Sequence, residues 1–200
     1  MSEAIGLYGG AFDPPHFAHL ILAAEAQSQL ALRRILWLPT PQPPHKPDRV
    51  LTPLEDRIAM LHLVLDDLPG FEISTVEAER TGPHYTVETL AVLREQYPAA
   101  DFVLLIGGDS LRDFLSWRQP ADILAACRTI GVMRRLGDAI RLDVLEEKLP
   151  GLSQKVRFVN APQLEISSAE IRRRIAAGEH YRYYLHPDVY QYIEANGLYR

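Results

Sequence analysis

A glycine pair between an apolar run and a helix-forming segment constrains the fold of this chain more than any other feature of its 200 residues. The run Ala4–Tyr8 is long enough for a buried strand, and Ile21–Leu30 is rich in strong helix formers. Between them, Gly9 and Gly10 can adopt positive φ and allow a ligand close to the backbone. Because a strand, a glycine turn and a helix present backbone N–H groups and a helix N-terminus, the segment predicts an anion-binding loop.

Two histidines follow the glycines at a spacing that one helical turn brings together. If a helix begins near Pro15, His16 and His19 share a face of its first turn and can donate hydrogen bonds to phosphoryl oxygens. A zinc site is a second interpretation, but it needs a third ligand, and neither His45 nor His84 gives a standard zinc spacing. Packed or surface histidines are a third. Phosphate contact fits the preceding loop best.

Strand-like and helix-like segments alternate along the chain. The apolar run 102–106 is typical of a central strand buried on both faces, and the alternating segment 71–77 of an edge strand. Further strands are predicted over 34–39, 129–133 and 155–159, and helices over 87–97, 111–117, 121–127, 138–149, 167–177 and from 187 to about 196. The order predicts an α/β, Rossmann-like, doubly wound fold with a mostly parallel sheet, which binds ligands beyond the carboxyl ends of its strands.

Three helix starts have local signals. Thr52–Glu55 is a capping box with proline at the first helical position, and Thr86 can cap the helix that follows it. The apolar stripe predicted for the first of these helices is Ile58, Leu61, Leu65 and Leu68. Ser167–Glu170 is a second capping box, whose helix N-terminus is itself an anion site. Arg172 then points toward the same anion, and a bidentate guanidinium suits phosphate.

Composition limits the classes of partner. Acidic residues outnumber basic ones by 26 to 21, which argues against a general nucleic-acid surface. The single Cys127 excludes an intramolecular disulfide and fits a reducing compartment. No apolar run reaches the roughly 18 residues of a membrane span, and no secretion signal is present, so we expect a cytoplasmic protein without a membrane partner. With no repeat or linker, residues 1–200 are predicted to form one domain.

The motif Gly9-Gly10-x-Phe12-Asp13-Pro14-x-His16-x-x-His19 resembles the signature of the nucleotidylyltransferase superfamily, and Ile166–Arg172 resembles its second motif. Between them, four segments occur in the order of the bacterial nicotinate-nucleotide adenylyltransferase family: Pro43-Pro44-His45-Lys46, Tyr85-Thr86, Gly107-x-Asp109-Ser110 and Trp117. The similarity extends to Gly197–Arg200. The sequence departs from the family at Ala11, Ala18, Thr40-Pro41 and Arg118, where Ser or Thr, Gly, an asparagine pair and Tyr are frequent.

The resemblance implies an enzyme that transfers the adenylyl group of ATP to nicotinate mononucleotide, giving deamido-NAD and pyrophosphate in NAD biosynthesis. ATP would bring Mg²⁺, with no dedicated metal site on the protein, and the oligomeric state stays open, a homodimer among the options. Residues from about 160 to 200 would carry the second phosphate-binding motif and the closing helices. The implied catalytic residues are His16, His19 and Arg172. The implied ATP and phosphate contacts are Gly9, Gly10, Ala11, Phe12, Gly107, Asp109, Arg134, Ser167 and Ser168. The implied pyridine-nucleotide contacts are His45, Lys46, Tyr85, Thr86, Trp117 and Arg118.

Three other functions have to be weighed. A related adenylyltransferase could use nicotinamide mononucleotide, phosphopantetheine or FMN as the acceptor. A dinucleotide-binding oxidoreductase would need a G-x-G-x-x-G pattern at the first strand, which is missing. A catalytically silent nucleotide-binding regulator is disfavoured because both histidines and Arg172 are present.

Overall fold

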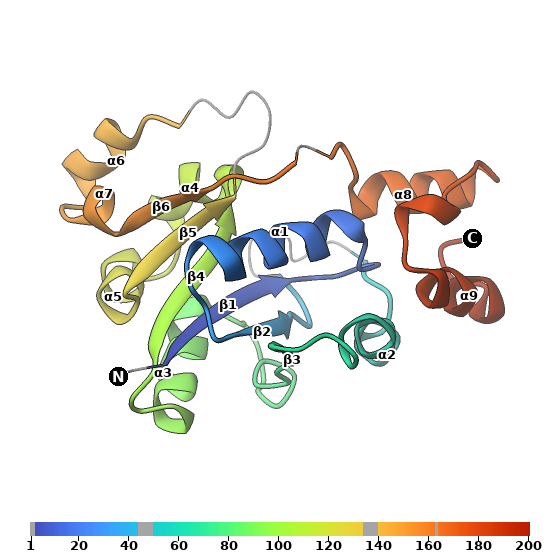
Figure 1. Ribbon diagram of the computed structural model, residues 1–200, viewed down its shortest axis with the longest axis horizontal. Helices are drawn as coiled ribbons and strands as arrows, with labels where there is room; N and C mark the ends of the chain where they lie inside the picture. The colour runs from blue at the N-terminus through green and yellow to red at the C-terminus, as the bar shows by residue number, and fades with distance from the viewer. Residues whose placement is uncertain (1–2, 44–49, 134–139, 163) are drawn as a thin grey trace.

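A parallel sheet is the centre of the molecule (Figure 1), seen in a computed structural model that describes residues 3–43, 50–133, 140–162 and 164–200. Within these ranges the sheet has six strands, in the order β3-β2-β1-β4-β5-β6, and every neighbouring pair is parallel. The strands are β1 (Ala4–Gly10), β2 (Arg34–Pro39), β3 (Phe71–Ile73), β4 (Asp101–Gly107), β5 (Thr129–Met133) and β6 (Val156–Val159). The order reverses between β1 and β4, at the point where doubly wound sheets bind ligands. The predicted Rossmann-like fold is confirmed.

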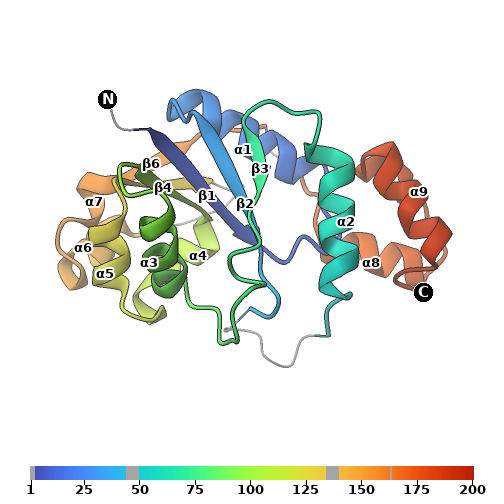
Figure 2. The ribbon, with the colours of Figure 1, turned by 90° about the horizontal axis from the view of Figure 1, so that it is seen from below.

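Helices cover both faces of the sheet (Figures 1 and 2). They are α1 (Phe17–Gln29), α2 (Leu54–Leu65), α3 (Thr86–Gln96), α4 (Gly108–Arg112), α5 (Pro120–Ala126), α6 (Leu142–Lys148), α7 (Leu152–Lys155), α8 (Ser168–Ala176) and α9 (Pro187–Asn196), with single 3₁₀ turns η1 (Phe114–Ser116) and η2 (Arg182–Tyr184). Helices α8 and α9 lie beyond the carboxyl end of β1 (Figure 1). In the described ranges, no helix combines the length and apolar composition needed to cross a membrane.

Two hydrophobic clusters, one on each face, hold the helices against the sheet. One contains buried residues of α1, α2, α8 and α9, and the other contains buried residues of α3 to α7. Strand β4 contributes alternately to both: Val103 and Leu105 to the first, Phe102 and Leu104 to the second. The prediction of a central strand buried on both faces is therefore confirmed, as is the edge position of 71–77, although β3 covers only Phe71–Ile73.

Two of the predicted helix caps are wrong. Pro53 is the N-cap of α2 rather than its first helical residue, because its ψ of 141° is extended and not helical (φ −44°). No side chain accepts a capping hydrogen bond at this helix start. Thr86 is the first residue of α3, and Tyr85 occupies the N-cap without a side-chain hydrogen bond. By contrast, the Ser167 hydroxyl oxygen caps α8 by accepting from the Glu170 amide at 3.2 Å, as predicted.

The buried stripe of α2 also differs from the predicted one. Its members are Arg57, Met60, Leu61, Val64 and Leu65, spaced by three or four residues as one helical face requires. Of the predicted stripe, Ile58 is only partly buried and Leu68 lies beyond the helix and is exposed. The stripe therefore includes an arginine that the sequence pattern alone did not single out.

Other boundaries moved by a few residues. The strand predicted over 155–159 begins at Val156, and the helix predicted over 138–149 is described from Leu142. The short helical pieces predicted around 111–117 are α4, which begins earlier, at Gly108, and η1. None of these differences moves a motif away from the carboxyl edge of the sheet.

Candidate active site

A cavity of about 240 Å³ opens where β1 and β4 adjoin, at the point of strand-order reversal. It is lined by residues of both strands and of the loops that follow them. Eight predicted site residues line it together: Gly9, Gly10, Ala11, Tyr85, Thr86, Gly107, Trp117 and Arg118. The structure thus brings residues from four separate parts of the sequence to one place.

The two glycines are the last residues of β1, not a separate turn. They pair with Leu38 and Pro39 of β2, and neither adopts positive φ, so that part of the prediction is wrong. A Cβ on Gly9 would meet nothing within 4 Å, whereas one on Gly10 would come within 3.1 Å of the Phe12 ring. Glycine at 9 therefore keeps the cavity wall bare, and glycine at 10 makes room for Phe12.

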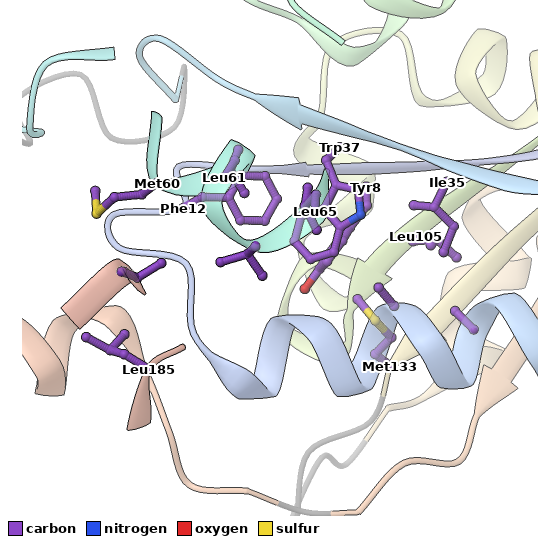
Figure 3. Close-up of a cluster of buried hydrophobic side chains, with 14 of the residues drawn as sticks. Tyr8, Phe12, Ile35, Trp37, Met60, Leu61, Leu65, Leu105, Met133 and Leu185 are labelled. Carbon is purple, nitrogen blue, oxygen red and sulfur yellow. The ribbon is translucent and has the colours of Figure 1, made fainter. Parts of the chain in front are cut away.

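The left-handed backbone of this loop is at Phe12, where φ is 47°. The Phe12 ring is buried, with ring centroids 5.5 Å from Tyr8, 5.1 Å from Trp37 and 5.2 Å from His19 (Figure 3). A left-handed conformation costs a non-glycine residue about 1–2 kcal/mol, which burial of an aromatic side chain offsets. Because the ring belongs to the core, only the backbone of Phe12 remains for the predicted ATP contact.

His16 and His19 are stacked at the start of α1. Their ring centroids are 3.7 Å apart and the planes differ by 19°. His16 is the N-cap, and its backbone N–H donates to Nδ1 of His19 at 3.2 Å. Because Nδ1 accepts that bond, the neutral His19 ring carries its proton on Nε2, where it can donate to a ligand. The predicted shared face is confirmed.

The second motif contacts the first directly. Ser168 Oγ donates to the Pro14 carbonyl at 2.9 Å, and Arg172 Nη1 donates to the Asp13 carbonyl at 2.6 Å. Arg172 also lies 3.7 Å from the Asp13 carboxylate. From the C-terminal segment, the Tyr199 hydroxyl donates to Asp13 Oδ1 at 2.9 Å. Asp13 is 1% exposed, so it stabilises the loop rather than facing a ligand.

The far wall of the cavity is aromatic. Tyr85 and Thr86 begin α3, and Trp117, which follows η1, packs its ring 5.3 Å from Phe114. The Arg118 guanidinium lies 5.3 Å from the centre of the Tyr85 ring. A flat face and a helix N-terminus therefore adjoin the same space, which suits a planar ring that carries an anionic group.

A buried polar cluster at this wall was not predicted as part of the site. Glu77, His84 and Thr89 are buried and line the cavity. Thr89 Oγ1 donates to Glu77 Oε1 at 2.8 Å, and Arg80 Nη2 donates to Thr89 Oγ1 at 2.9 Å. Burial lowers the pKa of His84, so its ring is neutral at pH 7. The sequence signal for including His84 in the site was its position directly before the predicted contacts Tyr85 and Thr86.

Asp109 lies in the first turn of α4 and does not cap it, since Gly107 is the N-cap and no side chain bonds there. Arg57 was missed altogether, although it is 1% exposed and donates to loop carbonyls beside the cavity. The sequence signal for Arg57 was a charged residue at the helical spacing of the apolar residues that form the buried face of α2.

Some predicted contacts cannot be placed. His45, Lys46 and Arg134 lie outside the described residues. Within the described ranges, no group of three or more His, Cys, Asp or Glu side chains is arranged to hold a metal ion.

Known proteins resemble this chain over nearly its whole length. Residues 7–174 match the family model described as cytidylyltransferase-like. A protein of Thermomicrobium roseum named "Probable nicotinate-nucleotide adenylyltransferase" is 42% identical over 98% of this chain and 91% of its own length. A protein of the same name from Salinibacter ruber is 40% identical over 98% of this chain and 97% of its own.

A solved structure of similar fold is the Plasmodium falciparum nicotinic acid mononucleotide adenylyltransferase complexed with NaAD. It is 23% identical, with a TM-score of 0.80 over 98% of this chain and 97% of that one. At this identity the likeness concerns the fold, whereas the family follows from the sequence matches. The chain therefore belongs to the cytidylyltransferase-like family and, within it, to the nicotinate-nucleotide adenylyltransferases.

Proposed function

We propose that this chain is a nucleotidyltransferase that moves the adenylyl group of ATP to nicotinate mononucleotide, giving deamido-NAD and pyrophosphate in NAD biosynthesis. The observation that carries this is the contact between Arg172 and Asp13, which joins the second motif to the first, whose Gly9, Gly10 and Ala11 line the cavity. The names of relatives at 40–42% identity support the choice of substrates.

The reaction needs positioning and charge neutralisation rather than an activated protein nucleophile. The 5′-phosphate of the mononucleotide is already ionised at pH 7; its oxygen bonds to the α-phosphorus of ATP while the bond to the bridging oxygen of pyrophosphate breaks. We assign three donors to the oxygens that gain charge: the Nε2–H of His19, the His16 ring and the N–H groups of Arg172 that do not bond Asp13. Preorganised donors of this kind contribute roughly 3–4 kcal/mol each to transition-state stabilisation. The Ser168 hydroxyl donates to the Pro14 carbonyl and so joins the two motifs. Mg²⁺ enters as part of the ATP substrate and keeps several of its waters.

The pyridine end selects the acceptor. Trp117 stacks on the pyridine ring, and the N–H group of Thr86, at the start of α3, holds the carboxylate. The Tyr85 N–H donates to the Pro83 carbonyl at 3.2 Å instead. His45 and Lys46 are assigned to the phosphate of the mononucleotide and Arg134 to that of ATP, on the sequence pattern alone. Since α8 supplies part of the phosphate end, we infer that residues 1–200 work as one catalytic domain.

One assay separates the candidate functions. Pyrophosphate release from ATP is measured with nicotinate mononucleotide, nicotinamide mononucleotide, phosphopantetheine and FMN in turn. We expect the highest kcat/KM with the nicotinate compound. Equal kcat/KM for the acid and the amide would refute the selective pocket, and no release with any acceptor would refute the proposed function.

A further inference from the structure

We propose that Arg57 is a positioning residue for this reaction: its guanidinium ties the loop after β1 to the loop after β2 at the mouth of the cavity. The proposal rests on the proposed function, because it concerns the same site. It assigns a positioning role to a residue that is not among the proposed contacts to either substrate.

The guanidinium reaches backbone carbonyls of three loop segments. Nη1 donates to Ala11 O at 2.7 Å and to Thr40 O at 2.8 Å, Nη2 to Pro41 O at 3.1 Å, and Nε to Thr52 O at 2.9 Å. Ala11 and Thr40 both line the cavity. One side chain therefore sets the distance between two of its walls.

Burial makes this arrangement stiff. Arg57 is 1% exposed, and a guanidinium stays charged at any ordinary pH. Hydrogen bonds from a charged donor are roughly twice as strong as neutral ones, and a carbonyl that moved away would leave buried charge unsolvated. The planar fork also fixes the directions of its donors, which a lysine ammonium in the same place would not do.

The consequence for the site follows from peptide geometry. In a trans peptide the C=O and the N–H point in opposite directions, so turning Ala11 O toward Arg57 turns the Phe12 N–H away from it. That N–H belongs to the loop assigned to ATP phosphates. The same loop is joined to Thr40, whose N–H donates to Gly10 O at 2.9 Å. Arg57 thereby aims a phosphate donor and holds the segment that leads to Pro43 on the cavity wall.

Arg94 offers a matched control. It donates to Ala100 O at 2.6 Å and to Ala126 O at 3.2 Å, so it also holds chain segments through backbone carbonyls. Ala100 directly precedes β4 and Ala126 is the last residue of α5, before β5, so both lie at the amino ends of these strands, away from the cavity. Loss of Arg94 should lower stability without changing the site.

The test compares Arg57→Met and Arg57→Lys with Arg94→Met and Arg94→Lys. Thermal unfolding is recorded first, and kinetics with ATP and nicotinate mononucleotide are then measured well below each midpoint. We expect Arg57→Met to lose roughly 100-fold in kcat/KM, the size of effect that a misplacement of about 1 Å causes, with KM raised for both substrates. Arg57→Lys should recover part of the loss. The Arg94 variants should keep the kcat/KM of the unaltered protein.

Other outcomes decide against the proposal. Unchanged kcat/KM in folded Arg57→Met would overturn it, and so would failure of both Arg57 variants to fold while the Arg94 variants fold, since Arg57 would then be a structural residue. If the unaltered protein releases no pyrophosphate with any acceptor, the proposed function has failed instead. In that case ATP binding by calorimetry decides: we expect weaker binding in Arg57→Met than in Arg94→Met, and equal binding would contradict a positioning role.

Discussion

The two ends of the site are held in different ways. At the proposed phosphate end, Asp13 accepts a hydrogen bond from Arg172 on its carbonyl and one from Tyr199 on its carboxylate. Ser168 donates to the carbonyl of the next residue, Pro14. At the proposed pyridine end, Trp117 and Tyr85 line the cavity, which also extends to Gly9, Gly10 and Ala11. The proposed phosphate end is therefore held by hydrogen bonds between the loop after β1 and the C-terminal segments. The proposed pyridine end is instead formed by aromatic side chains that line the cavity.

The difference matches what each end has to do. Charge develops on the phosphoryl oxygens during the reaction, so donors there must be in place beforehand. The pyridine ring changes little between substrate and product, and stacking on an aromatic face is sufficient to hold it. Changes at the phosphate end should therefore lower kcat, and changes at the pyridine end should raise KM for the acceptor.

The largest effect should come from His19→Ala. Loss of a preorganised donor costs roughly 100-fold or more in kcat, with ATP binding little changed. The measurement is steady-state pyrophosphate release together with calorimetric ATP binding. His62→Ala, which removes an exposed histidine paired with Asp66, is the control and should leave both unchanged. Turnover close to that of the control would remove His19 from transition-state stabilisation.

Tyr199→Phe should have the next largest effect. It deletes a hydrogen bond to a buried carboxylate, which is worth about 2 kcal/mol in the free energy of unfolding, and it loosens the loop that carries the histidines. Tyr192→Phe removes a similar bond, to Asp56 at 2.8 Å, away from the loop. Urea unfolding and kcat are measured for both variants. We expect only Tyr199→Phe to lower kcat; an equal loss in both would mean that Asp13 does not need this bond.

Trp117→Ala should act on the acceptor alone. Stacking of a charged pyridine on tryptophan is worth about 1 kcal/mol, which raises KM for nicotinate mononucleotide roughly fivefold and leaves KM for ATP unchanged. Tyr183→Ala, at an aromatic residue that is exposed, serves as the control. A rise in both KM values would show that the two ends are not separable.

The smallest effect concerns pH at the pyridine end. Burial lowers the pKa of His84 below its ordinary 6.5, against the attraction of Glu77 and Glu88 and together with the repulsion of Arg80. Below pH 6.5 the unfolded chain binds a proton at His84 more readily than the folded state does. The stability that the neutral His84 contributes is therefore complete above pH 6.5 and is lost as the pH falls below it. Unfolding free energies measured between about pH 7.5 and 5.5 should fall less steeply in His84→Gln than in the unaltered protein. Parallel slopes would contradict a buried neutral His84.

Many of the strands, helices and motif positions could be predicted from the sequence, because apolar runs and short motifs are local features. The run 102–106 and the helix start at Ser167 gave the correct elements. The cap predicted at Thr52 is wrong because the backbone of Pro53 is extended (ψ 141°), so the helix begins one residue later than the sequence pattern indicates. Positive φ was expected at glycine and occurs at Phe12, because burial of the ring in the core offsets the backbone cost.

The residues that sequence reasoning missed act through distant contacts. Arg57 reaches carbonyls up to 46 positions away along the chain, and no local pattern specifies them. The hydrogen bond from Thr89, in α3, to Glu77 joins residues 12 positions apart, so it forms only when α3 packs against the loop that precedes it. Such partners depend on the folded arrangement, so a single sequence indicates at most that a polar residue stands where an apolar one is usual.

The bond between Tyr199 and Asp13 has a consequence for the order in which the molecule is completed. Its partners are 186 positions apart, so during synthesis the histidine loop leaves the ribosome long before the tyrosine that steadies it. A growing chain can form the sheet and the cavity early. We expect full activity only after the segment that follows α9 has packed against the loop after β1.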